Sequence, residues 1–329
     1  MFFKKIKSFI AIFIVATFIM PQTLFAYSDY IIAGGENIGL QINNNGVIIA
    51  GFYKVGDMSP GVEANLKAGD TIVKVDDNNV KTIDDFITSI KNSNQRSLKI
   101  TYKRNKKNSD TTLNLINEDN TLKTGLYVKD MVSGIGTLTF IDPKTKLYGA
   151  LGHEVIEGTS GVMLNVKDGK IYDSNVTSID KSTRGEPGAK NANVNSNEVF
   201  GDIKENTTSG IFGSYTKEIN KNSLYKVVDY EDIKLGKAKI ITVLKDDIKT
   251  EYEINIIKVT NDGNSNKNIL FEVTDDNLVE KTGGIVQGMS GSPIIQGDNI
   301  IGAVTNVVVN NPKRGYGILI TTMLKEAEN

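Results

Sequence analysis

Short apolar runs separated by polar turns dominate the chain after its first 26 residues. IGLQINNNGVIIAGFY (38–53) alternates apolar and polar positions as half-buried strands do, and TIVKV (71–75) and SLKITYKRN (97–105) have the same character. TIDDFITSIKNS (82–93) instead repeats its apolar residues at the spacing of one helical face, after a capping-box-like start at Thr82. The first third of the chain therefore predicts several strands and one amphipathic helix.

The pattern changes at about residue 125. GLYVKDMVSGIGTLTFIDPKTKLYGALGHEVIEG (125–158) contains short β-type runs with Gly and Asp-Pro turns, and similar runs continue to the C-terminus. Many short strands at close spacing predict an all-β barrel or sandwich. The asparagine-rich stretch at 180–210 is expected to form long surface loops.

The first residues read as an export signal. Lys4, Lys5 and Lys7 precede an apolar run from Phe9 to Met20, and small residues follow at a cleavage-like position near Ala26. The run is short for a stable membrane span, which needs roughly 20 apolar residues. We expect a signal peptide or an uncleaved signal anchor, and an exported remainder.

Composition excludes several kinds of chemistry. The net charge of −1 gives no basic excess for nucleic acid, and the absence of cysteine excludes disulfides and thiol catalysis. His153 is the single histidine, so a site with several histidine ligands is impossible. No dense run of alternating Asp or Asn resembles a calcium loop. We expect no metal and no cofactor.

One serine stands between glycines in GMSGSP (288–293). An unactivated serine hydroxyl is a poor nucleophile, so an imidazole must take its proton and N–H groups must hold the oxyanion. The flanking glycines would let the backbone present the N–H groups of Gly288 and Ser290 as those donors. His153 follows a strand-like run (147–151), and strand ends often carry function. Ser290 and His153 are therefore the candidate nucleophile and base.

The third catalytic group is less well defined by the sequence. A carboxylate should fix the imidazole tautomer, and Asp202, Asp275 and Asp276 lie between His153 and the serine in chain order, as in double-barrel peptidases, whereas Asp142 does not. The rival serine, Ser292, precedes a proline that lacks an N–H and fits the motif less well.

SPGVEANLKAGDTIVKVDDNNV (59–80), within its order of strands and helix, resembles the signature of PDZ domains. The resemblance implies a groove in which a peptide adds a strand and a loop binds its terminal carboxylate. The best match to that loop is Gly39, Leu40, Gln41 and Ile42, and the helix bearing Ile83 and Ile87 would form the other wall. The alternative for the helix residues is that they belong to the core.

Three longer segments resemble the stage IV sporulation protein B peptidase family: 134–155, 271–295 and 300–318. G-x-S-G-x-P is also the pattern of chymotrypsin-like serine peptidases. The resemblance implies a sporulation peptidase, secreted from the forespore into the space between its two membranes, that cleaves itself and the extracytoplasmic part of a membrane-bound partner. Carried over by position, the family's catalytic residues are His153, Asp275 and Ser290.

We therefore expect a mainly β protein in which a PDZ domain precedes a chymotrypsin-like double barrel. The expected divisions are a signal segment (1–26), the PDZ domain (27–116), a linker (117–126) and the peptidase (127–329). Its partners would be a protein substrate on a membrane-bound regulator and, in the PDZ groove, a peptide C-terminus or the chain's own N-terminal segment. The alternative functions are a non-enzymatic PDZ scaffold and a general quality-control protease of the envelope.

Overall fold

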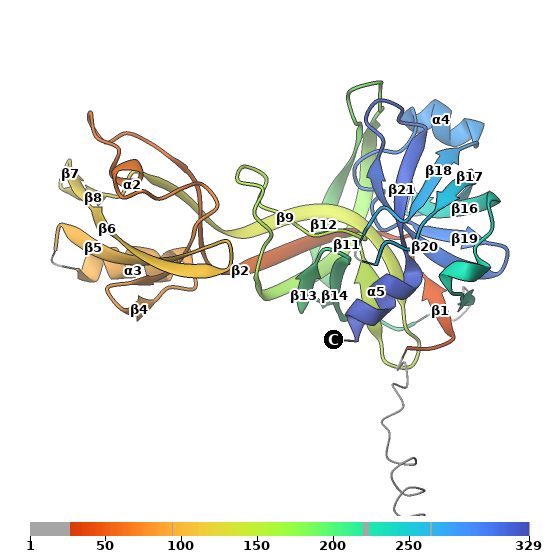
Figure 1. Ribbon diagram of the computed structural model, residues 1–329, viewed down its shortest axis with the longest axis horizontal. Coiled ribbons are helices and arrows are strands. Elements are labelled where there is room, and N and C mark those ends of the chain that lie inside the picture. The colour runs from red at the N-terminus through yellow and green to blue at the C-terminus, as the bar shows by residue number, and fades with distance from the viewer. Residues whose placement is uncertain (1–26, 94, 220–223, 264, 329) are drawn as a thin grey trace, which may run out of the picture.

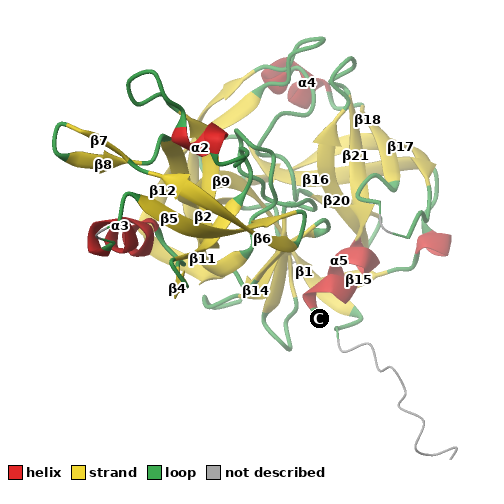
Figure 2. Ribbon diagram, turned by 60° about the vertical axis from the view of Figure 1, so that its left-hand side comes forward, coloured by secondary structure: helices red, strands yellow, loops and turns green. Residues whose placement is uncertain are grey.

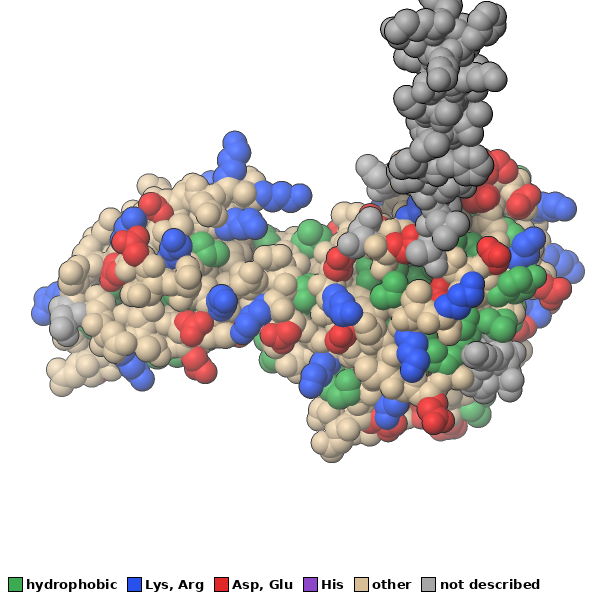
Figure 3. Space-filling view, turned by 90° about the horizontal axis from the view of Figure 1, so that it is seen from below, with side chains coloured by type: hydrophobic (Ala, Val, Ile, Leu, Met, Phe, Trp, Pro, Cys, Tyr) green, Lys and Arg blue, Asp and Glu red, His purple; other side chains and the backbone are tan. Residues whose placement is uncertain are grey.

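The computed structural model describes residues 27–328, apart from 94, 220–223 and 264, and the expected signal segment lies outside this range. The chain forms two lobes (Figure 1). From below, Figure 3 shows a waist between them, with acidic and basic side chains interspersed over both. Within the described residues, no helix has the length and apolar character needed to cross a membrane.

Two long strands join the lobes. β2 (Asn37–Phe52) and β9 (Leu126–Ile141) pair antiparallel from Phe52↔Leu126 at one end to Asn37↔Thr137 at the other. They run side by side from one lobe to the other (Figure 1). The connection between the lobes is therefore continuous sheet. Most of the expected linker 117–126 lies in the β7–β8 hairpin on the smaller lobe instead, and its last residue, Leu126, begins β9.

The smaller lobe has the PDZ pattern of strands and helices. Its core gathers buried residues around Phe86, Leu98 and Ile100. The capping box is confirmed, because the Thr82 hydroxyl accepts the Asp85 N–H at 3.1 Å and the Asp85 carboxylate accepts the Thr82 N–H at 3.0 Å. Besides β2 and β9 the elements are α2 (Pro60–Glu63), β3 (Thr71–Val75), β4 (Asn78–Asn79), α3 (Ile83–Asn92), β5 (Ser97–Arg104), β6 (Lys107–Asn114), β7 (Ile116–Glu118) and β8 (Thr121–Lys123).

The larger lobe is a β structure with two halves, each with its own buried cluster. The first half packs residues such as Leu138, Tyr148 and Ile171, and the second packs residues such as Ile254 and Phe271. The first half adds β1 (Tyr30–Ala33), β10 (Leu147–Ala150), β11 (Val166–Asp180), β12 (Ala189–Asp202), β13 (Glu205–Thr207), β14 (Gly210–Ser214) and β15 (Leu224–Val227).

The helices that the structure describes in the larger lobe belong to its second half. The elements of this half are η2 (Tyr230–Asp232), β16 (Gly236–Val243), β17 (Lys249–Val259), β18 (Ile269–Val273), α4 (Asp276–Thr282), β19 (Pro293–Gln296), β20 (Asn299–Val307), β21 (Arg314–Leu319) and α5 (Ile320–Ala327). Figure 2 shows these helices at the periphery of the strands. The mainly β prediction is confirmed.

Two sequence-based expectations about this lobe are wrong. The PDZ domain does not begin at residue 27, because β1 pairs with β9 and β15 inside the larger lobe. The first half of β2 also lies in the larger lobe, where it pairs with β9 and β11. The stretch 180–210 is not simply loop, because β12 pairs with β11 along most of its length. β12 was missed because it is largely exposed, so polar residues occupy positions that a buried strand would fill with apolar ones.

Candidate active site

His153 and Ser290 come from different halves of the larger lobe and line one cavity of about 500 Å³. His153 lies just after β10, at the strand end where the sequence placed it, and Ser290 lies in the turn before β19. Leu40, Leu151 and Thr305 line the same cavity. The structure therefore brings the two candidate residues to one site.

The turn that carries Ser290 depends on its glycines. Gly288 and Gly291 have φ angles of +92° and +95°, in the region where a side chain is strained. A Cβ on Gly291 would also collide with the Thr137 carbonyl oxygen. β9 fixes the turn, because the Thr137 N–H donates to the Ser290 carbonyl at 3.0 Å and the Thr137 hydroxyl donates to the Gly288 carbonyl at 2.8 Å.

The predicted oxyanion donors have no hydrogen-bond acceptor in the part of the chain that the structure describes. The N–H groups of Gly288 and Ser290 donate to no acceptor among the described residues, whereas the neighbouring N–H groups of Met289 and Gly291 donate to Val286 and Val304. Two unpaired N–H groups beside a serine that lines a cavity are what an oxyanion hole requires.

Ser290 and His153 do not hydrogen-bond to each other in this arrangement. The Ser290 hydroxyl donates to the Thr305 carbonyl at 2.8 Å, and His153 Nδ1 lies 2.8 Å from the Glu154 carbonyl. A carbonyl can only accept, so in the neutral ring Nδ1 carries the proton and Nε2 has the free lone pair. This tautomer is the one that a general base for serine needs.

Asp275 is not at the site. It is the N-cap of α4, where its Oδ1 accepts the Leu278 N–H at 3.0 Å and its Oδ2 accepts the Glu253 N–H at 3.3 Å. It does not line the cavity with His153. The role carried over from the family resemblance is therefore not realised in this arrangement, because the carboxylate is engaged by backbone N–H groups elsewhere.

The other three aspartates do not line the cavity either. Asp142 and Asp202 accept backbone N–H groups of their own surroundings, and Asp276 is the first residue of α4. The acidic residue that does line the cavity is Glu154, whose backbone carbonyl orients His153. Ser292, the rival serine, is fully buried and its hydroxyl has no hydrogen-bond partner among the described residues, so it does not compete as nucleophile.

A buried lysine supports the oxyanion turn, and sequence reasoning missed it. The carbon stem of Lys190 packs against Gly288, and its N–H donates to the Gln287 carbonyl at 2.9 Å. Its Nζ donates to the Thr242 hydroxyl at 2.9 Å, and burial lowers the pKa of Lys190 to about 7. Its position in an asparagine-rich, polar stretch gave no sign of burial.

The predicted PDZ peptide loop is wrong. Gly39, Leu40, Gln41 and Ile42 belong to the half of β2 in the larger lobe, where β9 pairs with one edge and β11 with the other. An extended peptide cannot add a strand where both edges are taken.

An open edge exists on β9 instead. Residues 126–131 pair with β2 on one side, and no second strand pairs with them among the described residues. α3 lies beside this segment, because the Ile83 N–H donates to Asp130 Oδ2 at 2.8 Å. Ile83 and Val128 pack against the PDZ core, whereas Ile87 is exposed. A strand edge next to a helix is the arrangement that accepts an extended peptide.

Comparison with known protein families identifies the family of this chain. A model of the SpoIVB peptidase S55 family matches residues 120–324, which is more than half of the chain and includes His153 and Ser290. The chain belongs to the SpoIVB peptidase S55 family. A PDZ-domain model matches residues 37–115, so the family's peptidase follows the PDZ domain, as the sequence predicted. The protein is accordingly a serine peptidase.

Solved structures resemble the two parts separately. The PDZ domain of an SdrC-like protein from Listeria monocytogenes is 29% identical over 27% of this chain and 93% of that chain, with a TM-score of 0.23. The Rv3671c protease of M. tuberculosis, as a serine-to-alanine mutant in its inactive form, is 13% identical over 59% and 82%, with a TM-score of 0.32. Its active form is 14% identical over 60% and 74%, with a TM-score of 0.30. No curated protein matches.

The S55 match and the structure divide the chain at a similar place. The match begins at residue 120, in the hairpin before β9, while β1 and half of β2 return to complete the peptidase lobe from the N-terminal side. No cluster of three or more potential metal ligands occurs in the described part of this S55 peptidase.

Proposed function

We propose that this S55 peptidase is an endopeptidase in which Ser290 is the nucleophile and His153 the general base. The observation that carries the proposal is the shared cavity, which combines the two side chains with the unpaired N–H groups of Gly288 and Ser290. The Nδ1–H tautomer of His153, set by the Glu154 carbonyl, supports it further.

The reaction begins when the Ser290 hydroxyl turns from the Thr305 carbonyl to His153 Nε2. Its oxygen attacks the peptide carbonyl carbon while Nε2 takes the proton, and the N–H groups of Gly288 and Ser290 bind the oxyanion. Collapse breaks the C–N bond, and the His153 imidazolium protonates the leaving amine. Water, deprotonated by His153, then cleaves the acyl-enzyme and restores Ser290.

The proposed substrates are the chain itself and an extracytoplasmic segment of a membrane-bound regulator. Cleavage would pass a signal from forespore to mother cell, and the enzyme would work in the space between the forespore membranes. Membership of the SpoIVB peptidase family and the signal-like first 26 residues support this proposal. The open edge of β9 would hold a peptide C-terminus or the chain's own N-terminal segment.

The test is the mass of the full chain over time, purified in mild detergent, beside Ser290→Ala. We expect fragments from the parent and none from the variant, and the fragment ends would reveal the cleavage sites. Co-incubation with the extracytoplasmic segment of a candidate regulator then tests the substrate. A parent that cleaves folded and unfolded proteins alike would instead indicate a quality-control protease, and a parent without any peptidase activity would favour a scaffold.

A further inference from the structure

One buried carboxylate on the loop that carries His153 has its charge partner on β9. Lys129 Nζ lies 2.6 Å from Glu157 Oε1, and the Glu157 side chain is 0% exposed. Burial alone would raise the pKa of Glu157, but the Lys129 ammonium and the N–H groups of Ser160 and Thr159 outweigh it and lower the pKa to about 2. Glu157 is therefore a buried anion that depends on these partners.

The Glu157 carboxylate organises the middle of this loop, residues 151–165. Its second oxygen accepts the Ser160 N–H at 2.7 Å and the Thr159 N–H at 3.1 Å. The backbone closes the same turn, because the Glu157 N–H donates to the Val162 carbonyl at 2.8 Å. His153 lies four residues before Glu157. Glu157 therefore holds a turn that is close to His153 along the chain.

Lys129 belongs to the part of β9 that forms the open edge of the PDZ lobe. Its backbone pairs with Ile48 of β2. Successive side chains of a strand point to opposite faces. Asp130 therefore faces α3, where it accepts the Ile83 N–H, while Lys129 on the other face meets Glu157. One strand contacts the PDZ helix on one face and the loop of the catalytic histidine on the other.

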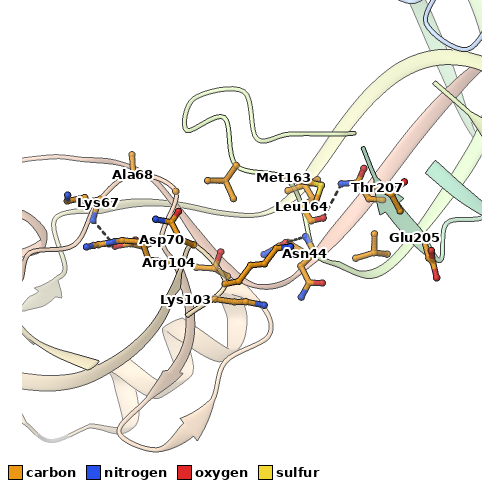
Figure 4. A pocket seen from close by; sticks show the side chains of 18 of the residues that line it. Asn44, Lys67, Ala68, Asp70, Lys103, Arg104, Met163, Leu164, Glu205 and Thr207 are labelled. Carbon is orange, nitrogen blue, oxygen red and sulfur yellow. Dashed lines mark hydrogen bonds and ion pairs between the residues drawn. The ribbon is translucent and has the colours of Figure 1, made fainter. Parts of the chain in front are cut away.

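Leu151, Val155 and Leu164 anchor the two arms of the loop in the core of the first half, so the ion pair acts on the turn between them. The Asn206 side chain bonds to the Val155 backbone and to the Leu164 carbonyl at 2.7–3.0 Å. A cavity of about 820 Å³ lies between residues 162–165 of the loop and the PDZ lobe, and beside it the side chains of Ser160 and Val162 come close to Gly69 of that lobe. Figure 4 shows Met163 and Leu164 on one side of it and Asp70 and Arg104, from the PDZ lobe, on the other. Among the described residues, the Lys129–Glu157 pair is the one ion pair that joins this loop to the rest of the protein.

We propose that Lys129 is a positioning residue for His153: through Glu157 it holds the loop, so that the PDZ lobe completes the peptidase site. The Lys129 side chain is 47% exposed, but that of Glu157 is not, so loss of the ammonium leaves a buried carboxylate held only by the Ser160 and Thr159 N–H groups, which is unfavourable. The turn relaxes toward water across the adjacent cavity, and His153 moves away from its place near Ser290. A shift of about 1 Å in a catalytic group can cost on the order of a hundredfold in rate. The inference rests on the proposed roles of Ser290 and His153.

The test measures the rate at which a fluorophosphonate labels Ser290 in the full chain. We expect Lys129→Met and Glu157→Gln each to lower the rate by at least about tenfold. Lys129→Arg keeps the charge and should stay within about threefold of the parent. The double variant should be no slower than Lys129→Met alone, because the two residues act as a pair.

The matched control is Lys239→Met, which breaks an ion pair of the same 2.6 Å length with Glu251 on the surface of the second half. It should leave the labelling rate unchanged. Melting curves of all variants show which of them remain folded, so that slow labelling by a folded variant can be assigned to displacement of His153. Equal labelling by the parent and a folded Lys129→Met variant would overturn the inference, as would failure of Lys129→Arg to retain the rate. A parent that takes no label would contradict the proposed function instead.

Discussion

Thr137 holds the turn that carries Ser290 with two hydrogen bonds, one from its backbone N–H and one from its hydroxyl. Its N–H donates to the Ser290 carbonyl at 3.0 Å, and its hydroxyl donates to the Gly288 carbonyl at 2.8 Å. Because a carbonyl and the next N–H share one peptide plane, these bonds orient the peptides 288–289 and 290–291, which flank the peptide that carries the Ser290 N–H. β9, which begins at the open PDZ edge, therefore ends by supporting the catalytic turn.

Thr137→Val should reduce catalysis more than stability. The change keeps the shape and removes the bond to the Gly288 carbonyl, which we expect to cost about 1 kcal/mol of unfolding free energy. The fluorophosphonate labelling rate should fall at least about tenfold, because an oxyanion-hole donor loses its alignment. Thr139→Val is the control, since the Thr139 hydroxyl binds the Gly291 carbonyl beyond the nucleophile. Equal labelling of the two variants would contradict the role given to Thr137.

Asp275→Asn should retain most of the labelling rate. Asn is as good an N-cap as Asp, so the start of α4 should persist and the labelling rate should stay within about threefold of the parent. Asp275→Ala removes the cap and should cost about 1 kcal/mol of unfolding free energy, measured by denaturant titration. A hundredfold loss of labelling in a folded Asp275→Asn variant would show that the carboxylate reaches His153 during catalysis.

The buried Lys190 predicts a rise of stability with pH. Its pKa of about 7 in the folded chain lies below the ordinary 10.5, so between these values the unfolded chain binds more protons. Stability from this group is therefore lowest below pH 7 and grows as the pH rises toward 10.5. From pH 7.5 to 9 the free energy of unfolding should increase by about 2 kcal/mol.

Lys190→Met should abolish that increase, because the thioether fills the same space without titrating. The exposed Lys181→Met should leave it intact. Denaturant titrations at the two pH values measure the difference. A parent whose stability stays constant or falls over this range would contradict a neutral Lys190 in the folded chain.

The sequence predicted the local features of this molecule well. Thr82 and Asp85 were recognised as a capping box because that signal lies within four residues. His153 at a strand end and the serine between glycines were recognised for the same reason. The S55 resemblance then supplied the link between two residues far apart in the chain, and the shared cavity shows them together.

The errors in the PDZ region involve long-range pairing. Gly39 to Ile42 had the right local pattern for a PDZ loop, but β9 pairs with one edge of this segment and β11 with the other. The open edge at Leu126 to Met131 begins at the last residue of the expected linker, and the rest of it fell within the expected peptidase. Asp275 could have been recognised as a helix cap, since an apolar residue follows at Leu278 in a helical pattern, but the family resemblance favoured a catalytic role.

The most direct test of the account is active-site labelling with a fluorophosphonate, followed by mass mapping of the modified peptide. The full chain should be labelled on Ser290, and Ser292→Ala should be labelled equally because Ser292 is buried. Ser290→Ala and His153→Ala should take essentially no label. Label on another residue, or equal labelling of Ser290→Ala, would contradict the claim that Ser290 is the nucleophile of this peptidase.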